Sequence, residues 1–272
     1  MQSTEYLIRS GALRMANYAD YSEEYAECYD FITQHKCYLG EVNSLVEFLE
    51  PFNIDGKILS VGCGTGFHEF YLAKNGFKVF GIDKSEWMIN HALLKSKSTS
   101  NLSFGLTYDH AEQYLGAPLR CIISLFNVVN CLPDLCSLRD FFNEIFSRMD
   151  QGGVFVFEAW NGMECVINPP KHVSREFNDC DGSHLHRKAS PKLNKSSQHL
   201  QIEYEISGFI NGRSVALNSV HDIRLFTVNE ILYLLSSVGF ESVHIFSSLP
   251  SLEPFNIDSS NPPRMLAFTA MK

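Results

Sequence analysis

The sequence predicts an α/β fold in which a mainly parallel sheet carries helices on both faces. Two observations support this prediction: strand and helix signals alternate between residues 57 and 159, and the first strand leads directly into a glycine-rich turn at 62–66. Short apolar runs of this kind are typical of parallel strands that are buried on both faces. Alternating strands and helices favour crossover connections between parallel neighbours.

The elements before residue 160 follow from their periodicity and end signals. Residues 1–20 are polar and weakly patterned, which predicts a mobile arm or a short helix, whereas apolar spacing predicts helical structure between 21 and 52. Strands are expected at 57–61, 78–82, 102–106, 121–126 and 154–159. Helices are expected at 68–75, ended by Gly76, at 85–95, begun by a Ser85 cap, and at 138–149.

The pattern changes after Trp160. Residues 162–199 are rich in Asn, Pro, Ser, Lys and His and show little periodicity. Residues 201–210 and 213–225 are interpreted as antiparallel strands, because Asn211-Gly212 between them suits a type I′ turn, whose central residues need positive φ. We expect this hairpin to be a lid over the ligand end of the sheet, with an extension of the sheet as the alternative. The remaining expected elements are a helix at 228–238 and strands at 243–246 and 265–271.

The glycine-rich turn and the acid after the next strand predict a nucleoside site. Gly62, Gly64 and Gly66 let the backbone approach a ligand at dihedral angles that other residues resist. The helix that follows directs its N-terminal N–H groups at the turn. Asp83 ends the neighbouring strand, where its carboxylate can accept hydrogen bonds from both hydroxyls of a ribose. The alternative is a tight strand–helix turn in some other doubly wound protein.

The spacing of the glycines narrows the choice of ligand. The turn has the form G-x-G-x-G, which differs from the G-x-G-x-x-G of dinucleotide sites, and Phe67 and His68 follow it where a phosphate-binding site would have a lysine. This compact form resembles motif I of class I S-adenosylmethionine (SAM)-dependent methyltransferases. The resemblance implies SAM as the cofactor, and because SAM carries no phosphate, the turn would face its methionine end.

Composition and charge argue against several classes of partner. The formal net charge is −9, which is unfavourable for a nucleic-acid partner. Eight cysteines without a C-x-x-C pair, and an N-terminus unlike a signal peptide, favour reduced thiols in the cytoplasm. No apolar run approaches the roughly 20 residues that a membrane helix needs. We therefore expect a cytoplasmic protein with a small-molecule acceptor, no nucleic-acid or membrane partner, and a monomeric or homodimeric state.

Further segments resemble the N,N-dimethyltransferases of nucleotide-linked amino-deoxysugars. Residues 26–30 match the A-x-x-Y-D pattern of that group, and residues 158–160 match its E-x-W. The other similar segments are 36–38, 221–227 and 238–240. The likeness spans about residues 20–272. It implies the Rossmann-like class I methyltransferase fold, with a mainly parallel seven-stranded sheet and an inserted antiparallel lid, and it implies N-methylation of an amino sugar or a related amine.

Two segments depart from the pattern of that group. Residues 105–109 read Gly-Leu-Thr-Tyr-Asp where the group has G-D-x-x, so the acid, Asp109, is displaced. Cys131 stands near the place where the sugar enzymes tend to have a histidine. An O-methyltransferase of a small natural-product hydroxyl and a non-catalytic SAM-binding protein are therefore kept as alternatives.

The resemblance also implies roles for individual residues. Tyr29 is expected beside the transferred methyl group, since aromatic faces suit cationic groups, and His221 is expected to orient or deprotonate the acceptor. The expected cofactor contacts are Tyr38, Gly62, Cys63, Gly64, Gly66, Asp83, Lys84, Met88, Tyr108, Asp109, Phe126 and Asn127. The expected substrate contacts are Cys131, Glu158, Trp160 and Arg224.

The chain divides into four expected parts and contains no expected metal site. The parts are an N-terminal arm with helices at 1–52, a SAM-binding core at 53–161, a lid at 162–225 and a C-terminal part of the core at 226–272. His184 and His186 have no Asp, Glu or Cys partner at ligand spacing, which favours a solvated loop over a metal site. The lysines at 188, 192 and 195 could meet an anionic substrate, with a solvated loop as the alternative.

Overall fold

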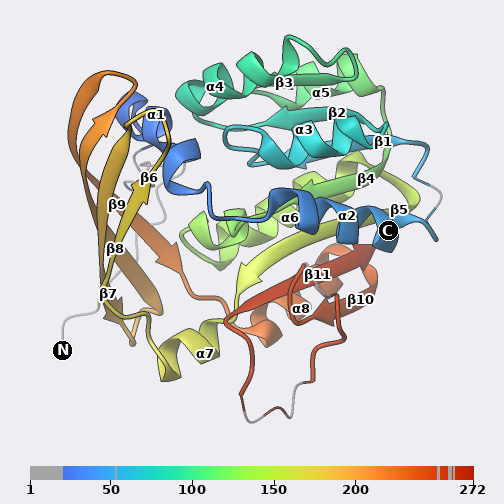
Figure 1. Cartoon of the computed structure of the whole chain (residues 1–272). Helices are drawn as coiled ribbons and strands as arrows, with labels where there is room; N and C mark the ends of the chain where they lie inside the picture. Colours follow the sequence, from blue (N-terminus) through green and yellow to red (C-terminus); the bar gives the residue numbers. More distant parts are fainter. Residues whose placement is uncertain (1–20, 53, 250–251, 257–258, 260) are drawn as a thin grey trace, which may run out of the picture.

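A seven-stranded sheet forms the centre of the molecule (Figure 1). The structure, a computed structural model, describes residues 21–52, 54–249, 252–256, 259 and 261–272. The strand order is β10-β11-β5-β4-β1-β2-β3; the five strands from β5 to β3 are parallel, and β11 runs antiparallel to both of its neighbours. The predicted α/β fold with a mainly parallel sheet is therefore confirmed. The arm expected at 1–20 lies outside the described residues.

The strands of this sheet lie close to their predicted positions. They are β1 (Lys57–Val61), β2 (Lys78–Ile82), β3 (Leu102–Gly105), β4 (Leu119–Ser124), β5 (Met149–Trp160), β10 (Glu241–Phe246) and β11 (Met265–Met271). All residues of β1 and β2 except the first of each are buried. Burial on both faces explains why these strands are apolar runs without polar–apolar alternation.

Helices cover both faces of the sheet. One face packs against α2 (Tyr38–Leu49), α3 (Phe67–Lys74) and α4 (Glu86–Ser96), and the other against α5 (Tyr108–Leu115), α6 (Leu135–Arg148) and α8 (Val228–Val238). The predicted cap at Ser85 is present, since its side chain accepts a hydrogen bond from Met88 N, and Thr227 forms a reciprocal capping box with Glu230 at the start of α8. The short helix α5 was not predicted; it has only eight residues and buries only Ala111 and Leu115.

A separate antiparallel sheet occupies the region after residue 160. It contains β6 (Val173–Asn178), β7 (His184–Asn194), β8 (His199–Ile210) and β9 (Arg213–Arg224), in that order, and follows the short helix α7 (Gly162–Ile167). Asn211 and Gly212 have φ of 50° and 78°, as a type I′ turn requires. The hairpin therefore belongs to its own sheet and does not extend the central one.

The low periodicity of residues 162–199 proved misleading, because this region contains one helix and two strands. In β7 only Leu185 is fully buried, and the inward positions between Leu185 and Leu193 include Arg187 and Pro191. A charged residue and a proline on the inner face obscure the alternation by which a half-buried strand is recognised. His184 and His186, expected in a loop, lie in this strand.

Helix α1 (Glu23–Ile32) joins the small sheet to the central sheet. Tyr25, Cys28 and Ile32 of α1 pack against Phe177 and Leu185 of the small sheet. In Figure 1 the small sheet stands beyond the end of the central sheet toward which the β5 arrow points. Among the helices of the described part, none has both the length and the apolar character needed to cross a membrane.

Candidate active site

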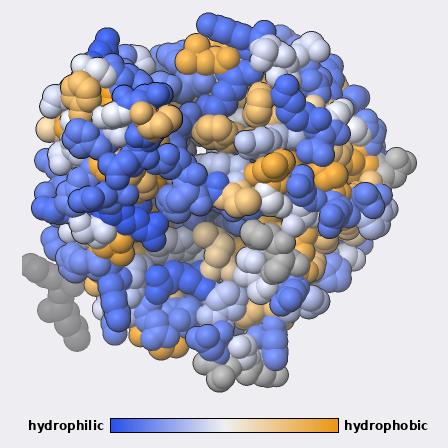
Figure 2. Space-filling model, in the orientation of Figure 1, coloured by the Kyte–Doolittle hydropathy of each residue, from blue (hydrophilic) through white to orange (hydrophobic). Residues whose placement is uncertain are grey.

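A cavity of about 520 Å³ lies at the carboxyl ends of the parallel strands. The last residues of β1 and β2 line it together with the segments that follow β1, β2 and β4, and Tyr21 and Tyr29 close it from the N-terminal side. Open α/β sheets bind ligands in this position. The surface is hollowed between the small sheet and the central sheet (Figure 2), so the cavity lies near the region where the two sheets face each other.

The glycine-rich turn presents backbone to this cavity. Gly62 N and Cys63 N donate to Ile82 O at 2.8 and 3.0 Å, which fixes the turn to the end of β2. Gly64 has φ of +55°, and the nearest atom to a Cβ built there would be Tyr29 Cε1 at 4.0 Å, so this position leaves space for a ligand. Gly66 differs: a Cβ there would lie 2.4 Å from Phe104, so this glycine serves the packing of α3.

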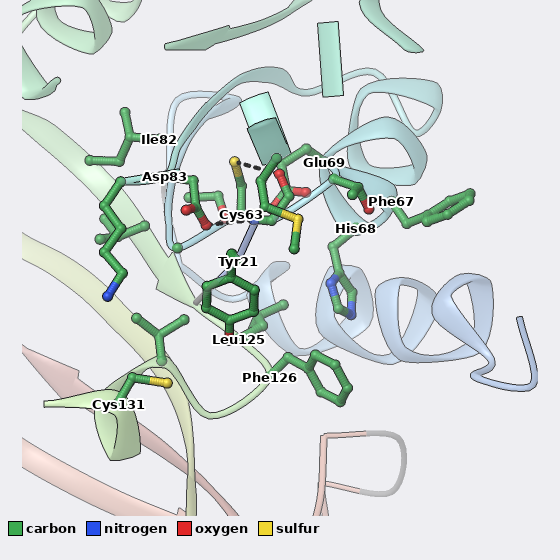
Figure 3. Close-up of a pocket in the computed structure, with 18 of the residues that line it drawn as sticks. Tyr21, Cys63, Phe67, His68, Glu69, Ile82, Asp83, Leu125, Phe126 and Cys131 are labelled. Carbon is green, nitrogen blue, oxygen red and sulfur yellow. Dashed lines mark hydrogen bonds between the residues drawn. The ribbon is translucent and has the colours of Figure 1, made fainter. Parts of the chain in front are cut away.

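Asp83 lies at the end of β2 and points its carboxylate toward the turn (Figure 3). Its Oδ2 accepts a hydrogen bond from Gly64 N and its Oδ1 accepts one from Ser85 N, each at 2.9 Å. Burial raises the pKa of Asp83, although the backbone N–H groups of Ser85 and Gly64 act against this shift. Each carboxylate oxygen has a second lone pair, so Asp83 can still accept two hydroxyl hydrogens. Its geometry fits the ribose of a nucleoside cofactor.

Asp30 fixes α1 over the turn. Thr65 Oγ1 donates to Asp30 Oδ1 at 2.5 Å, and Lys95 Nζ contacts Asp30 Oδ2 at 2.7 Å. These contacts hold the preceding residue, Tyr29, against the cavity. Burial raises the pKa of the Tyr29 hydroxyl well above its usual range, so this side chain is neutral at physiological pH. Tyr29 therefore offers an aromatic ring beside the glycine turn.

A second set of polar contacts joins α2 to α3. His68 Nε2 lies 2.8 Å from Glu41 Oε2, and Lys36 Nζ lies 2.5 Å from Glu41 Oε1. Burial acts to raise the pKa of Glu41, but the hydrogen bonds and charges of His68 and Lys36 outweigh it, and the pKa is lowered. The adjacent Tyr38 stacks on Phe67 with ring centroids 5.0 Å apart. Glu41 is thus the shared partner of His68 and Lys36.

Glu69, at the start of α3, was not predicted as a site residue. Its side chain lines the cavity, is 1% exposed and accepts a hydrogen bond from Ser60 Oγ at Oε1, at 2.5 Å. Burial raises its pKa, although the charge of His68 and the bond from Ser60 oppose this shift. The sequence signal was an acid in the first turn of the helix that leaves the glycine-rich turn. That signal also suits an ordinary helix N-terminus, so it did not distinguish a ligand contact.

The segment after β4 has an unusual backbone. Phe126 and Asn127 both have positive φ, at 62° and 68°. Glu158 Oε2 accepts a hydrogen bond from Phe126 N at 2.8 Å and thereby supports this turn. Non-glycine residues in this conformation cost about 1–3 kcal/mol each. Glu158 therefore supports the wall of the cavity from behind, whereas Phe126 itself belongs to the lining.

His221 lies in an aromatic cluster under the small sheet. Its ring centroid is 5.2 Å from that of Tyr21, 5.1 Å from Tyr25 and 4.9 Å from Tyr204. Burial, with the positive charges of Arg187 and Lys84, lowers the pKa of His221 to about 4. The imidazole is therefore neutral at physiological pH. Tyr21 contacts both His221 and the cavity, so one tyrosine connects the two.

The cavity brings together most of the predicted cofactor residues. Predicted residues that line it are Tyr29, Tyr38, Gly62, Cys63, Gly64, Asp83, Lys84, Met88, Tyr108, Phe126 and Cys131. Predicted residues outside the lining are Gly66, Asp109, Asn127, Glu158, Trp160, His221 and Arg224. Arg224 instead contacts Gln198 Oε1 at 3.0 Å and Glu230 Oε1 at 3.5 Å. Besides Glu69, lining residues that were not predicted include Tyr21, Ser60, Thr65, His68, Val128 and Phe141.

The described part of the chain shows no metal centre. No group of three His, Cys, Asp or Glu side chains within it is arranged to hold a metal ion.

Comparison with known proteins shows that the chain is similar to methyltransferases. A family model described as a methyltransferase domain matches residues 22–244. A Bacillus subtilis (strain 168) chain with the provisional name methyltransferase YqeM is 25% identical over 233 residues, covering 85% of this chain and 90% of that one. The dTDP-3-amino-3,4,6-trideoxy-alpha-D-glucopyranose N,N-dimethyltransferase of Streptomyces venezuelae is 27% identical over 223 residues, covering 80% and 91%.

A solved structure supports the same fold. The crystal structure of Streptomyces venezuelae DesVI superposes with a TM-score of 0.72, at 22% identity, and covers 91% of this chain and 98% of that chain. At this identity the likeness concerns the fold.

Proposed function

The chain belongs to the methyltransferase domain family and is a SAM-dependent methyltransferase; from this premise we propose that it methylates the nitrogen of a small amine, an amino sugar or a related compound. SAM supplies an electrophilic methyl group on a sulfonium. The residues of the cavity have to bind the donor, align the acceptor and keep the acceptor nitrogen neutral. Alignment of two reactants of this kind can contribute about 7–11 kcal/mol.

We propose that the methyl donor, SAM, binds at the carboxyl ends of β1 and β2. Asp83 accepts hydrogen bonds from the ribose hydroxyls, and the turn at Gly62–Gly64 faces the methionine end. The residues that fit these roles already lie together, with Gly64 N bonded to Asp83 Oδ2 at 2.9 Å. Tyr29 places its ring beside the turn, where an aromatic face is favourable for a cationic group.

The surroundings of His221 are the observation that supports an amine acceptor. Burial, Arg187 and Lys84 together make a protonated imidazole unfavourable at this position. The same positive field would disfavour the ammonium form of an acceptor that lies nearby, and only the neutral amine has the lone pair that attacks the methyl group. A histidine with a pKa of about 4 is also a weak base for a hydroxyl acceptor.

The Streptomyces venezuelae relative is named for a dTDP-linked amino sugar, and this name supports an amino sugar as the acceptor substrate. We propose that residues 162–225 act as the lid of the acceptor side, because α1 lies between this sheet and the glycine-rich turn. His221 on β9 would then orient the acceptor through Tyr21, without contact to the transferred methyl group.

A matched pair of substrates tests the proposal. A dTDP-linked 3-amino sugar and its 3-hydroxy counterpart are incubated with the protein and SAM, and the products are identified by mass spectrometry. The expected result is methylation of the amine alone. The Asp109→Ala protein is the control for the Asp83→Ala variant of the Discussion, because Asp109 is exposed and outside the lining. Methylation of the hydroxy sugar, with the amine left unchanged, would overturn the choice of nitrogen.

A further inference from the structure

Glu69 has one carboxylate oxygen that the protein does not use. Oε1 accepts the hydrogen bond from Ser60 Oγ, but Oε2 is fully buried and has no hydrogen-bond partner among the described residues. A buried carboxylate oxygen without a partner is costly, because it has lost its water and gained nothing in exchange. Because Glu69 lines the cavity, a bound ligand can provide the missing donor.

Two basic side chains near this part of the cavity are already engaged. His68, the preceding residue, contacts Glu41 at 2.8 Å, and Lys95 contacts Asp30 at 2.7 Å. Figure 3 shows Cys63 between the carboxylates of Glu69 and Asp83, so the second acid lies on the other side of the turn. The charges of both acids act to raise the pKa of the Cys63 thiol, beyond the larger effect of its burial. This part of the cavity is therefore negative and suits a cationic ligand group.

We propose that Glu69 Oε2 accepts a hydrogen bond from the α-ammonium group of the methionine tail of SAM. SAM has two cationic centres, but only the ammonium carries hydrogens that can be donated to a carboxylate. Asp83 is assigned to the ribose, and Glu69 lies across the turn from it, on the side left for the tail. The assignment rests on the identity of the cofactor and is independent of the acceptor.

Ser60 completes the arrangement as a positioning residue. It lies in β1, two residues before Gly62, and is 2% exposed. Its hydroxyl donates to Oε1, which leaves Oε2 as the oxygen without a partner. A short hydroxyl side chain in the strand thus fixes the carboxylate that comes from the helix.

The test compares ligands that differ only in the amino group. Calorimetric titration is carried out with S-adenosylhomocysteine and with its analogue that lacks the α-amino group. For the wild-type protein the analogue is expected to bind at least tenfold more weakly. The Glu69→Gln protein should bind S-adenosylhomocysteine at least tenfold more weakly than the wild type does. Its affinity for the deamino analogue should lie within about twofold of the wild-type affinity for that analogue. Such a cycle isolates the contact between the two groups.

Asp83→Asn is the matched control, because it should weaken both ligands by similar factors. Equal losses for both ligands in Glu69→Gln would overturn the assignment, and so would an unchanged affinity for S-adenosylhomocysteine. Weaker binding of SAM with unchanged binding of S-adenosylhomocysteine would instead place Glu69 at the sulfonium. If Glu69→Gln does not fold, equal affinities of the wild type for the two ligands would still overturn it. No acceptor is present, so a wrong acceptor class cannot produce any of these results.

Discussion

The two sides of the cavity differ in charge. At the carboxyl ends of β1 and β2, the acids Asp83 and Glu69 line the cavity, and burial raises the pKa of both. Under the small sheet, burial and Arg187 lower the pKa of His221. The first side favours a positive ligand and the second disfavours one. This difference matches a reaction in which a sulfonium donor meets a neutral amine.

The largest expected effect is on the donor side. Asp83→Ala removes an acceptor for two ribose hydroxyls, and charge-assisted hydrogen bonds are worth about 1.5–3 kcal/mol each. We therefore expect the dissociation constant of SAM to rise by at least about tenfold, measured by calorimetric titration. Asp109→Ala should leave it unchanged. Equal affinities of the wild-type and Asp83→Ala proteins for SAM would contradict the assignment of Asp83 to the ribose.

The second prediction concerns the pH dependence of stability on the acceptor side. The pKa of His221 is about 4 in the folded chain and 6.5 in the unfolded chain, so between these values the unfolded chain binds a proton that the folded chain does not. Stability should fall as the pH falls through this window, by about 1–3 kcal/mol at pH 4. Urea unfolding of the wild type and of His221→Gln measures this loss.

The His221→Gln protein should lose less stability than the wild type between pH 6.5 and pH 4. His184→Gln is the control, since His184 is exposed on β7. The same pH dependence in the wild type and in His221→Gln would show that the surroundings of His221 do not exclude positive charge.

The sequence predicts the structure around the glycine-rich turn better than it predicts the small sheet. The turn at Gly62–Gly66 and the acid at 83 were predictable because strand, turn and helix are adjacent in the chain and their spacing determines the geometry. Glu69 could not be recognised as a site residue, because its importance depends on burial and on the unused Oε2. Glu158 was predicted as a substrate contact, but it lies outside the cavity lining, and its carboxylate accepts a hydrogen bond from Phe126 N.

The small sheet was harder to predict for a physical reason. Its strands pair with their neighbours in sequence, but β7 carries Arg187 and Pro191 on its inner face, so its alternation of polar and apolar residues is weak. Only the hairpin at Asn211-Gly212 has a local signal strong enough to be recognised. The aromatic neighbours of His221 come from three separate segments, and no spacing rule connects them.

A smaller effect is expected at Tyr29, which lies between the two sides. Tyr29→Phe keeps the ring, whereas Tyr29→Ala removes it. Contacts of a cation with an aromatic face are worth about 0.5–2 kcal/mol. We therefore expect kcat/KM to fall by roughly 3- to 30-fold in Tyr29→Ala and by less than threefold in Tyr29→Phe. Equal losses in both variants would show that the hydroxyl carries the effect.

The smallest expected effect concerns Arg187. Replacement by Met removes one positive charge near His221, so the pKa of His221 should rise by about one unit or less. Titration of the His221 ring signals by NMR measures this shift. Arg213→Met is the control, because Arg213 is exposed and lies near Glu27. A lower pKa of His221 in Arg187→Met would contradict the conclusion that the charge of Arg187 disfavours protonation of His221.

The most direct test is a crystal structure of the protein with S-adenosylhomocysteine and a dTDP-linked amino sugar. We expect the ribose hydroxyls at Asp83, the ammonium group at Glu69, and the acceptor amine on the side of Tyr21 and the small sheet. A ribose bound away from Asp83, or an acceptor bound on the opposite side of Tyr29 from the small sheet, would contradict it.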